Sequence, residues 1–319
     1  MTWIAKPSLH HPSLGCNALG LTRRDYEGKS STLCAGCGHD AISAAIIRAC
    51  WELSIEPHRV AKLSGIGCSS KTPDYFLGQS HGFNTVHGRM PSVLTGANLA
   101  NRELVYLGVS GDGDSASIGI GQFVHAIRRG VNMTYIVENN GVYGLTKGQF
   151  SATADRGSLS KKGVANADAP IDLAGLALQL GASFVARSFS GDKQQLVPLI
   201  KGALSHRGAA FLDVIPEREA ISIDYAPGEV LDVPQHDGSV LRLRKLGASH
   251  DPSDRAAAIG HLHARQAHGE IVTGLLYVEP DADDLHDHLG TPATPLNALG
   301  PEELCPGSAA LERINASLR

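Results

Sequence analysis

The stretches Leu104-Val-Tyr-Leu-Gly-Val-Ser-Gly-Asp-Gly-Asp114 and Met133-Thr-Tyr-Ile-Val-Glu-Asn-Asn-Gly-Val-Tyr143 decide the fold. Each begins with an apolar run that predicts a buried strand, and residues 118–129 between them have the apolar spacing of a helix. A strand, a helix and a second strand predict a right-handed crossover between parallel strands. We therefore expect Asp112 and Asn140 at the carboxyl ends of neighbouring strands, where open α/β sheets bind ligands.

Carboxylate and amide oxygens at these strand ends indicate a magnesium site. Asp112 and Asn140 offer hard oxygen ligands, and Mg²⁺ usually takes its remaining ligands from water and a bound phosphate. Gly111 and Gly113 would let backbone N–H groups approach that phosphate. The alternative is two ordinary turns, Asp-Gly and Asn-Gly, which explains each dipeptide but not its place after a strand.

Strands and helices alternate along much of the chain. Further strands are predicted at residues 60–64, 183–187 and 210–215, and further helices at 40–53, 92–99, 171–180 and 193–204. This alternation predicts an α/β fold with a doubly wound, mostly parallel sheet.

The C-terminal part has a different pattern, which we interpret as an extension of the main domain. Two alternating runs around Asp237–Gly238 predict a hairpin, and a helix, a strand and a last helix near the C-terminus follow. We expect an N-terminal arm at residues 1–30, an α/β domain at 31–216 and a C-terminal extension with a hairpin and an arm at 217–319.

Composition argues against two classes of partner. The chain has 319 residues and a formal net charge of −4, so no bulk electrostatic attraction to nucleic acid is expected. No apolar run approaches the length of a membrane span. Because residues 1–20 lack the basic start and apolar core of a secretory signal, we expect a cytoplasmic protein.

Three cysteines lie in glycine-rich loops. Cys34-Ala-Gly-Cys37-Gly-His39 starts a predicted helix, and Cys68 follows in Gly65-Ile-Gly-Cys-Ser-Ser-Lys71. Three thiols in tight loops suggest iron–sulfur or zinc ligation, a redox pair at a helix N-terminus is the alternative, and free thiols are the third interpretation. Cys50 falls on the apolar face of its helix and is expected in the core.

Five motifs in order carry a family resemblance: residues 33–39, 65–71, 87–89, 111–114 and 139–149. Together they resemble the β subunits of the 2-oxoacid:ferredoxin oxidoreductases, and the C-terminal segment is similar to the longer, 2-oxoglutarate-type subunits. The resemblance implies thiamine diphosphate bound through Mg²⁺ to Asp112, Asn140 and the carbonyl of Val142. It also implies a thiamine site formed by His39, Ser69, His87, Gly111, Asp112, Gly113 and Asp114, in a thiamine diphosphate-binding domain at 31–216.

The resemblance further implies a reaction and an electron exit. A 2-oxo acid, with 2-oxoglutarate as the best guess, would be oxidatively decarboxylated with coenzyme A to succinyl-CoA, and electrons would pass to ferredoxin. Lys71 matches a basic residue near the substrate carboxylate, and Leu145 a position that affects substrate choice. A [4Fe–4S] cluster would be held by Cys34, Cys37 and Cys68. Pyruvate or a branched-chain or aromatic 2-oxo acid is the alternative substrate.

The chain departs from the family pattern after the strand at 210–215. The family's fourth cluster cysteine follows that strand, but here Pro216-Glu-Arg-Glu219 has no cysteine. A non-cysteine ligand, Cys16 or Cys305 could replace it, or the cluster is lost and the chain belongs to a non-redox thiamine decarboxylase. A metal-binding or assembly subunit would explain the cysteines but not the diphosphate motif.

The length of the predicted sheet also implies a partner. One α/β sheet supplies only the diphosphate half of a thiamine site, whereas the carboxylate that contacts the aminopyrimidine ring normally comes from a second domain. We therefore expect an α subunit and an αβ heterodimer or a dimer of heterodimers.

Overall fold

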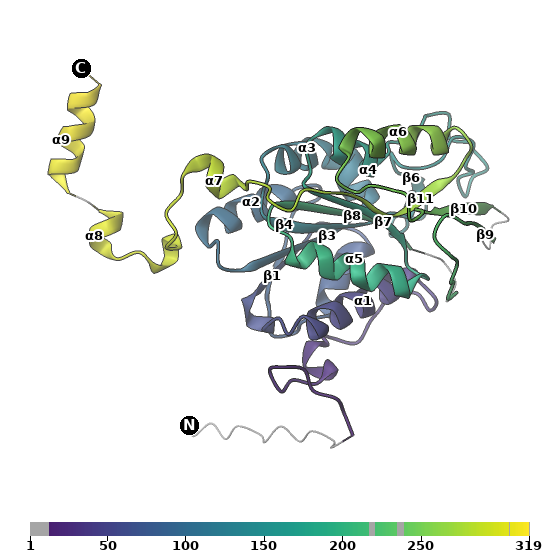
Figure 1. The fold of residues 1–319 in the computed structure, drawn as a ribbon, viewed down its shortest axis with the longest axis horizontal. Helices are drawn as coiled ribbons and strands as arrows, with labels where there is room; N and C mark the ends of the chain where they lie inside the picture. The colour runs from purple at the N-terminus through teal and green to yellow at the C-terminus, as the bar shows by residue number, and fades with distance from the viewer. Residues whose placement is uncertain (1–12, 217–220, 235–238, 306, 319) are drawn as a thin grey trace.

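The computed structural model describes residues 13–216, 221–234, 239–305 and 307–318, and their framework is a nine-stranded sheet in the order β2-β1-β3-β4-β8-β7-β11-β10-β9 (Figure 1). Every neighbouring pair from β2 to β7 is parallel, which confirms the predicted fold class. These strands are β1 (Val60–Ser64), β2 (His81–Asn84), β3 (Val105–Gly111), β4 (Met133–Glu138), β7 (Phe184–Phe189) and β8 (Ala209–Ile215).

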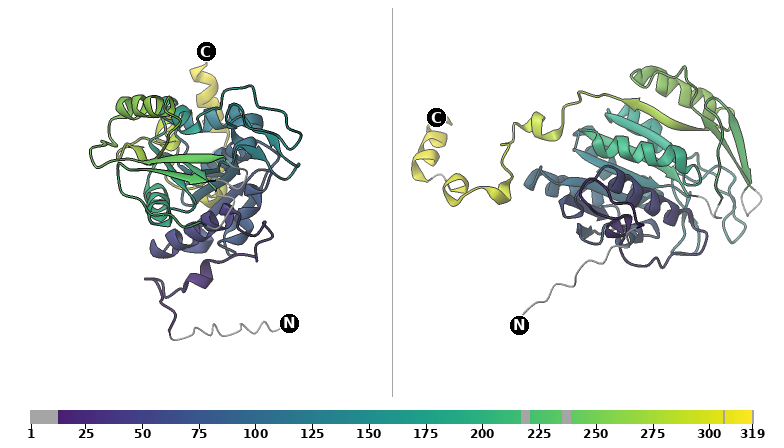
Figure 2. Two further views of the ribbon diagram at one scale, coloured as in Figure 1. Left: turned by 90° about the vertical axis from the view of Figure 1, so that its right-hand side faces the viewer. Right: turned by 60° about the horizontal axis from the view of Figure 1, so that its bottom comes forward.

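Helices cover both faces of this sheet and give three layers (Figures 1 and 2). One face carries α1 (Gly38–Glu52) and α5 (Lys193–Ser205); the other carries α2 (Met90–Ala100), α3 (Ile120–Arg128), α4 (Leu173–Gln179) and α6 (Arg255–Gln266). Alternate residues of the strands pack into the two layers: Phe211 of β8 joins the α3 side and Leu212 the α1 side. All six residues of β4 are buried, as expected of a central parallel strand.

The segment after Asp112 differs from the single helix expected at residues 118–129. A π-type turn covers Gly113–Ile118, and α3 begins only at Ile120. The wide turn directs the side chains of Asp114 and Ser115 inward, where both are buried and hydrogen-bonded. The sequence periodicity could not show this, because it depends on the contacts that Asp114 makes with other loops.

The C-terminal extension continues the main sheet. β11 (Ile271–Val278) pairs with β7 in antiparallel orientation, β10 (Val240–Lys245) runs parallel to β11, and β9 (Val230–Pro234) is antiparallel to β10. The expected hairpin is therefore present, although its turn at Asp237–Gly238 lies outside the described residues, as do residues 1–12 of the expected N-terminal arm. The division of the chain at residues 30 and 216 stays a prediction.

The last part of the chain leaves the body. After α7 (Leu285–Leu289) the short η5 (Leu296–Ala298) still contacts α2, and then α8 (Pro301–Leu304) and α9 (Ser308–Ser317) extend away from the sheet as an arm (Figures 1 and 2). Neither α8 nor α9 buries a residue. No helix in the described part of the chain is long and apolar enough to cross a bilayer.

Candidate active site

The two stretches that decide the fold meet at one edge of the sheet. Gly111, the last residue of β3, is in parallel register with Glu138, the last residue of β4. Asp112 and Asn140 follow these strand ends, and the backbone N–H of Asn140 donates to Oδ1 of Asp112 at 3.2 Å. The structure thus brings together the two side chains that the sequence predicts as magnesium ligands.

The Asp112 carboxyl is buried and hydrogen-bonded on both oxygens. Only 2% of the residue is exposed, and Oδ2 accepts hydrogen bonds from Oγ1 of Thr153 at 2.9 Å and from Oγ of Ser151. Burial raises the pKa of Asp112 above its usual value, although these hydrogen bonds lower it in part. An ionised carboxylate at this position is therefore costly unless a cation lies beside it.

Asn140 is held by the turn that follows it. Its Oδ1 accepts a hydrogen bond from the backbone N–H of Val142 at 3.0 Å. Gly141 has a φ of +71°, a left-handed conformation that favours glycine. This turn leads into β5 (Val142–Tyr143), which forms a small hairpin with β6 (Gln149–Phe150) beside the strand ends.

Asp114 hydrogen-bonds to the segments that surround the site. Its carboxylate accepts hydrogen bonds from the backbone N–H groups of Gly88 at 2.7 Å and Ile66 at 3.3 Å, and from Oγ of Ser110 at 2.5 Å. Nδ1 of His87 also contacts it. Although Asp114 lies at the predicted site, its oxygens join the loops after β1, β2 and β3.

A small cavity of about 110 Å³ lies between these loops. A Cβ on Gly111 would come within 2.6 Å of Oγ of Ser69, and one on Gly113 would collide with the ring of Tyr143, so a larger residue at either position would displace a neighbouring side chain. Most of the predicted site residues line the cavity: His39, Cys68, Ser69, His87, Gly111, Asp112, Gly113, Asp114, Asn140, Val142 and Leu145.

Glu138 is a site residue that the sequence reasoning missed. It lines the same cavity, is fully buried, and has no hydrogen-bond partner for either carboxyl oxygen among the described residues. Its Oε2 lies 3.5 Å from Nε2 of His39. Burial raises the pKa of Glu138 well above its usual value and lowers the pKa of His39 to about 4, so burial favours the neutral form of both side chains. An acidic residue directly before the Asn pair, at the end of a buried strand, was the available signal.

The three loop cysteines are free thiols on neighbouring loops. Cys34 is exposed, whereas Cys37 and Cys68 are half-buried, and burial raises the pKa of both half-buried thiols. Sγ of Cys37 lies 2.8 Å from Nδ1 of His39. In the described ranges, no three His, Cys, Asp or Glu side chains are grouped as a metal site, and the cluster stays a prediction.

The other three cysteines lie apart from this group. Cys50 is fully buried in α1, as expected, and burial raises its pKa to about 12. Cys16 is exposed, and Cys305 lies on the arm that leaves the body (Figure 1).

Comparisons with known proteins agree with the resemblance seen in the sequence. Residues 65–214 match the family model of the thiamine pyrophosphate enzyme C-terminal TPP-binding domain. The chain is 36% identical over 267 residues to the β subunit of 2-oxoacid:ferredoxin oxidoreductase 1 from Aeropyrum pernix, covering 81% of each chain. The chain belongs to the 2-oxoacid:ferredoxin oxidoreductase β subunits. This confirms the predicted family.

Two other relatives carry more specific names. The chain is 37% identical over 245 residues to the 2-oxoglutarate oxidoreductase subunit KorB of Mycobacterium tuberculosis, covering 74% of this chain and 61% of that one. It is 43% identical over 183 residues to a 2-oxoacid:ferredoxin oxidoreductase β subunit of Saccharolobus solfataricus, covering 57% and 60%. The chain thus spans about three fifths of the length of these relatives.

A solved structure matches over most of the chain. It is the 2-oxoglutarate:ferredoxin oxidoreductase from Magnetococcus marinus with 2-oxoglutarate, coenzyme A and succinyl-CoA bound. The TM-score is 0.74 at 33% identity, and the match covers 88% of this chain and 91% of the other.

The two residues predicted at the substrate lie at different distances from the cavity. Leu145 lines it and is 55% exposed. Lys71 is exposed and is not among the residues that line the cavity. It lies near Cys68, because its positive charge lowers the pKa of that thiol in part. The described residues therefore do not bring Lys71 into the cavity of this chain.

Proposed function

We propose that this chain is the thiamine diphosphate-binding β subunit of a 2-oxoacid:ferredoxin oxidoreductase. The observation that carries the proposal is the placement of Asp112 and Asn140, which are hydrogen-bonded to each other at the ends of adjacent parallel strands. The match of residues 65–214 to a TPP-binding domain supports it.

The free acceptor sites of these side chains suit Mg²⁺. An ionised carboxylate has about four lone-pair sites. Three hydrogen bonds from Asn140, Ser151 and Thr153 leave Asp112 with one, on Oδ1. The amide oxygen of Asn140 uses one lone pair for the N–H of Val142 and keeps the other. A divalent cation here would also offset the cost of burying the Asp112 carboxylate.

The buried pair of Glu138 and His39 would face the cofactor. Thiamine, when bound, supplies the electron sink for decarboxylation of a 2-oxo acid. A neutral carboxylic acid can donate a hydrogen bond from its O–H, and both carboxyl oxygens of Glu138 lack a partner among the described residues. Glu138 thus has a buried carboxyl group available to hydrogen-bond a ligand in the cavity.

We infer that an α subunit completes the site. Pockets that enclose a whole cofactor or drug-sized ligand measure roughly 300–1,000 Å³. The cavity of about 110 Å³ at Asp112 is smaller than this range. Part of the cofactor must therefore lie outside this chain, which supports an αβ assembly with a shared site.

We propose 2-oxoglutarate as the substrate, oxidised with coenzyme A to succinyl-CoA while ferredoxin accepts the electrons. The names of the Mycobacterium tuberculosis relative and of the Magnetococcus marinus complex support this choice. So does a 2-oxoglutarate synthase subunit KorB of Methanothermobacter thermautotrophicus, which is 39% identical over 185 residues. A [4Fe–4S] cluster on Cys34, Cys37 and Cys68 is a separate proposal, and we derive no electron step through it.

The test is dye reduction by the co-purified αβ complex under anaerobic conditions. A panel of 2-oxoglutarate, pyruvate and branched-chain or aromatic 2-oxo acids is assayed with methyl viologen, with and without coenzyme A. We expect coenzyme A-dependent reduction that is fastest with 2-oxoglutarate. Release of CO₂ without dye reduction would instead identify a non-redox thiamine decarboxylase.

A further inference from the structure

A series of hydrogen bonds leads away from Asp112 across the carboxyl edge of the sheet. The single hydroxyl hydrogen of Thr153 is shared between two acceptors, Oδ2 of Asp112 at 2.9 Å and Oδ1 of Asn139 at 2.8 Å. Nδ2 of Asn139 in turn donates to Oδ1 of Asp213 at 3.0 Å. Because a carboxylate only accepts, this last bond fixes which way the Asn139 amide points and directs its oxygen to Thr153.

The series ends in a buried ion triad. Nε of Arg187 donates to Oδ2 of Asp213 at 2.8 Å, and its Nη2 contacts Oδ1 of Asp172. Arg187 is 8% exposed and Asp213 1%. Asp172 also accepts from the backbone N–H groups of Ala174 and Gly175, at the start of α4. Asp213 is therefore held from the side opposite Asn139 by a guanidinium that is itself anchored to a helix.

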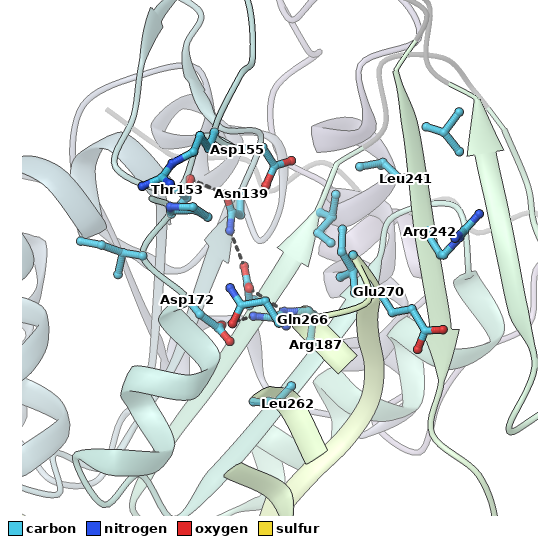
Figure 3. Close-up of a pocket in the computed structure, with 18 residues that line it drawn as sticks. Asn139, Thr153, Asp155, Asp172, Arg187, Leu241, Arg242, Leu262, Gln266 and Glu270 are labelled. Atoms are coloured by element: carbon cyan, nitrogen blue, oxygen red, sulfur yellow. Dashed lines mark hydrogen bonds and ion pairs between the residues drawn. The ribbon is translucent and has the colours of Figure 1, made fainter. Parts of the chain in front are cut away.

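This network lines a second cavity, which has a volume of about 450 Å³ and is lined by none of the predicted site residues (Figure 3). The close-up shows Thr153, Asn139, Arg187 and Asp172 following one another along its wall. Buried ion pairs add little net stability, because desolvation cancels much of their attraction. Stability alone therefore does not account for three charged side chains beside the proposed magnesium site.

We propose that Asp213, Asn139 and Thr153 are positioning residues that fix the orientation of the Asp112 carboxylate toward the metal. This rests on the proposed function. Thr153 and Ser151 hold Oδ2, so that the free acceptor site of Asp112 remains on Oδ1. Asn139 sets the place of the Thr153 hydroxyl, and Asp213, clamped by Arg187, sets the place of Asn139.

The experiment measures Mg²⁺ binding by the αβ complex rather than turnover. The apo complex, with thiamine diphosphate present, is titrated with Mg²⁺ by calorimetry for the wild type, Thr153→Val and Asp213→Asn. Partners of metal ligands typically contribute roughly 10–100-fold to metal affinity. We therefore expect the dissociation constant for Mg²⁺ to rise about tenfold in each variant. Thr153→Ser, which keeps the hydroxyl, should bind as the wild type does.

Thr134→Val is the matched control. Thr134 is a buried threonine on β4 whose Oγ1 donates to the backbone oxygen of Ala203 at 3.0 Å, away from Asp112. The Thr134→Val variant should lose stability, as Thr153→Val does, but its affinity for Mg²⁺ should equal that of the wild type. The double variant Thr153→Val with Asp213→Asn should lose less affinity than the product of the two single losses, because both act through one network.

Two results would overturn this inference while leaving the proposed function intact. One is wild-type Mg²⁺ affinity in both Thr153→Val and Asp213→Asn, and the other is an equal loss of affinity in Thr134→Val. If the wild-type complex shows no Mg²⁺-dependent binding of thiamine diphosphate, the proposed function fails and this inference fails with it.

Discussion

The two aspartates of the Gly-Asp-Gly-Asp run differ in what their oxygens contact, and this gives a prediction. Asp114 accepts hydrogen bonds from the backbone N–H groups of Ile66 and Gly88, from Ser110 of β3 and from His87. Asp114→Asn would leave some of these buried donors unpaired, at a cost on the order of 3 kcal/mol. Asp112→Asn should cost the apo protein less, because burial already disfavours its ionised form, but should abolish Mg²⁺ binding.

Thermal unfolding of the apo complex and Mg²⁺ calorimetry check both substitutions. The expected pattern is a large fall in unfolding temperature for Asp114→Asn and a loss of Mg²⁺ binding for Asp112→Asn. Equal falls in unfolding temperature for the two variants would contradict the assignment of separate roles.

At the residue scale, the sequence located the site but not the contacts that tune it. Asp112 and Asn140 could be predicted because each follows an apolar run that is itself recognisable as a strand. Thr153 and Asp213 could not be predicted as part of the site. Thr153 lies in a loop and Asp213 in β8, and no local sequence pattern shows that either lies near the end of β3. Glu138 was not predicted as a site residue, since its burial depends on packing from both layers.

At the element scale, Lys62 of β1 holds the end of the segment that carries Ser69 and Lys71. Its Nζ donates to the backbone oxygens of Phe76 at 2.6 Å and Leu77 at 3.0 Å. Burial lowers the pKa of Lys62 to about 8, with Asp74 raising it and Lys29 lowering it in smaller measure. Between pH 8 and about 10.4, the pKa of an unperturbed lysine, the unfolded chain therefore binds more protons here than the folded chain.

The unfolding free energy contributed by Lys62 should therefore rise with pH in this window, by up to about 1.4 kcal/mol per pH unit. Denaturant unfolding at pH 7.5, 8.5 and 9.5 measures it as the difference between the wild type and Lys62→Met. Lys162→Met is the control, because Lys162 is an exposed lysine in a loop and is not among the groups that shift the pKa of Lys62. A difference between the wild type and Lys62→Met that stays constant with pH would show that this lysine keeps its proton throughout.

The cysteine loops give a prediction about metal content. If Cys34, Cys37 and Cys68 hold a cluster, replacing any one of them by serine should lower the iron and sulfide content of the anaerobically purified complex. Cys305→Ser should not, because that thiol lies on the arm outside the body. An iron-free wild-type complex that still reduces ferredoxin would contradict the cluster proposal.

The elements themselves were largely predictable. β1 and β8 are found within a residue of their expected bounds, because both are short apolar runs between polar turns. β2 was not predicted, since all four of its residues are exposed and give no alternating or continuous apolar signal. The antiparallel pairing of β11 with β7 was also missed, because pairing between distant strands leaves no local pattern.

At the scale of the whole molecule, the arm should be independent of the body. Nη1 of Arg102 contacts the backbone oxygens of Thr291 and Pro292, both at 3.5 Å, and η5 lies against α2, so contact with the body continues up to η5. Because α8 and α9 bury no residue, deletion of residues 301–319 should leave the unfolding temperature of the body unchanged. Scanning calorimetry measures this, and a fall of several degrees would mean that the arm packs against the sheet.

The size of the cavity leads to the last prediction. Because about 110 Å³ encloses only part of a cofactor, the isolated chain should bind thiamine diphosphate and Mg²⁺ at least about tenfold more weakly than the αβ complex, a difference of roughly 1.4 kcal/mol. Calorimetric titration of both species measures it, with circular dichroism to verify that the isolated chain is folded. The isolated chain should also show no coenzyme A-dependent dye reduction. Equal affinity and full turnover without the α subunit would mean that this chain builds the whole site by itself.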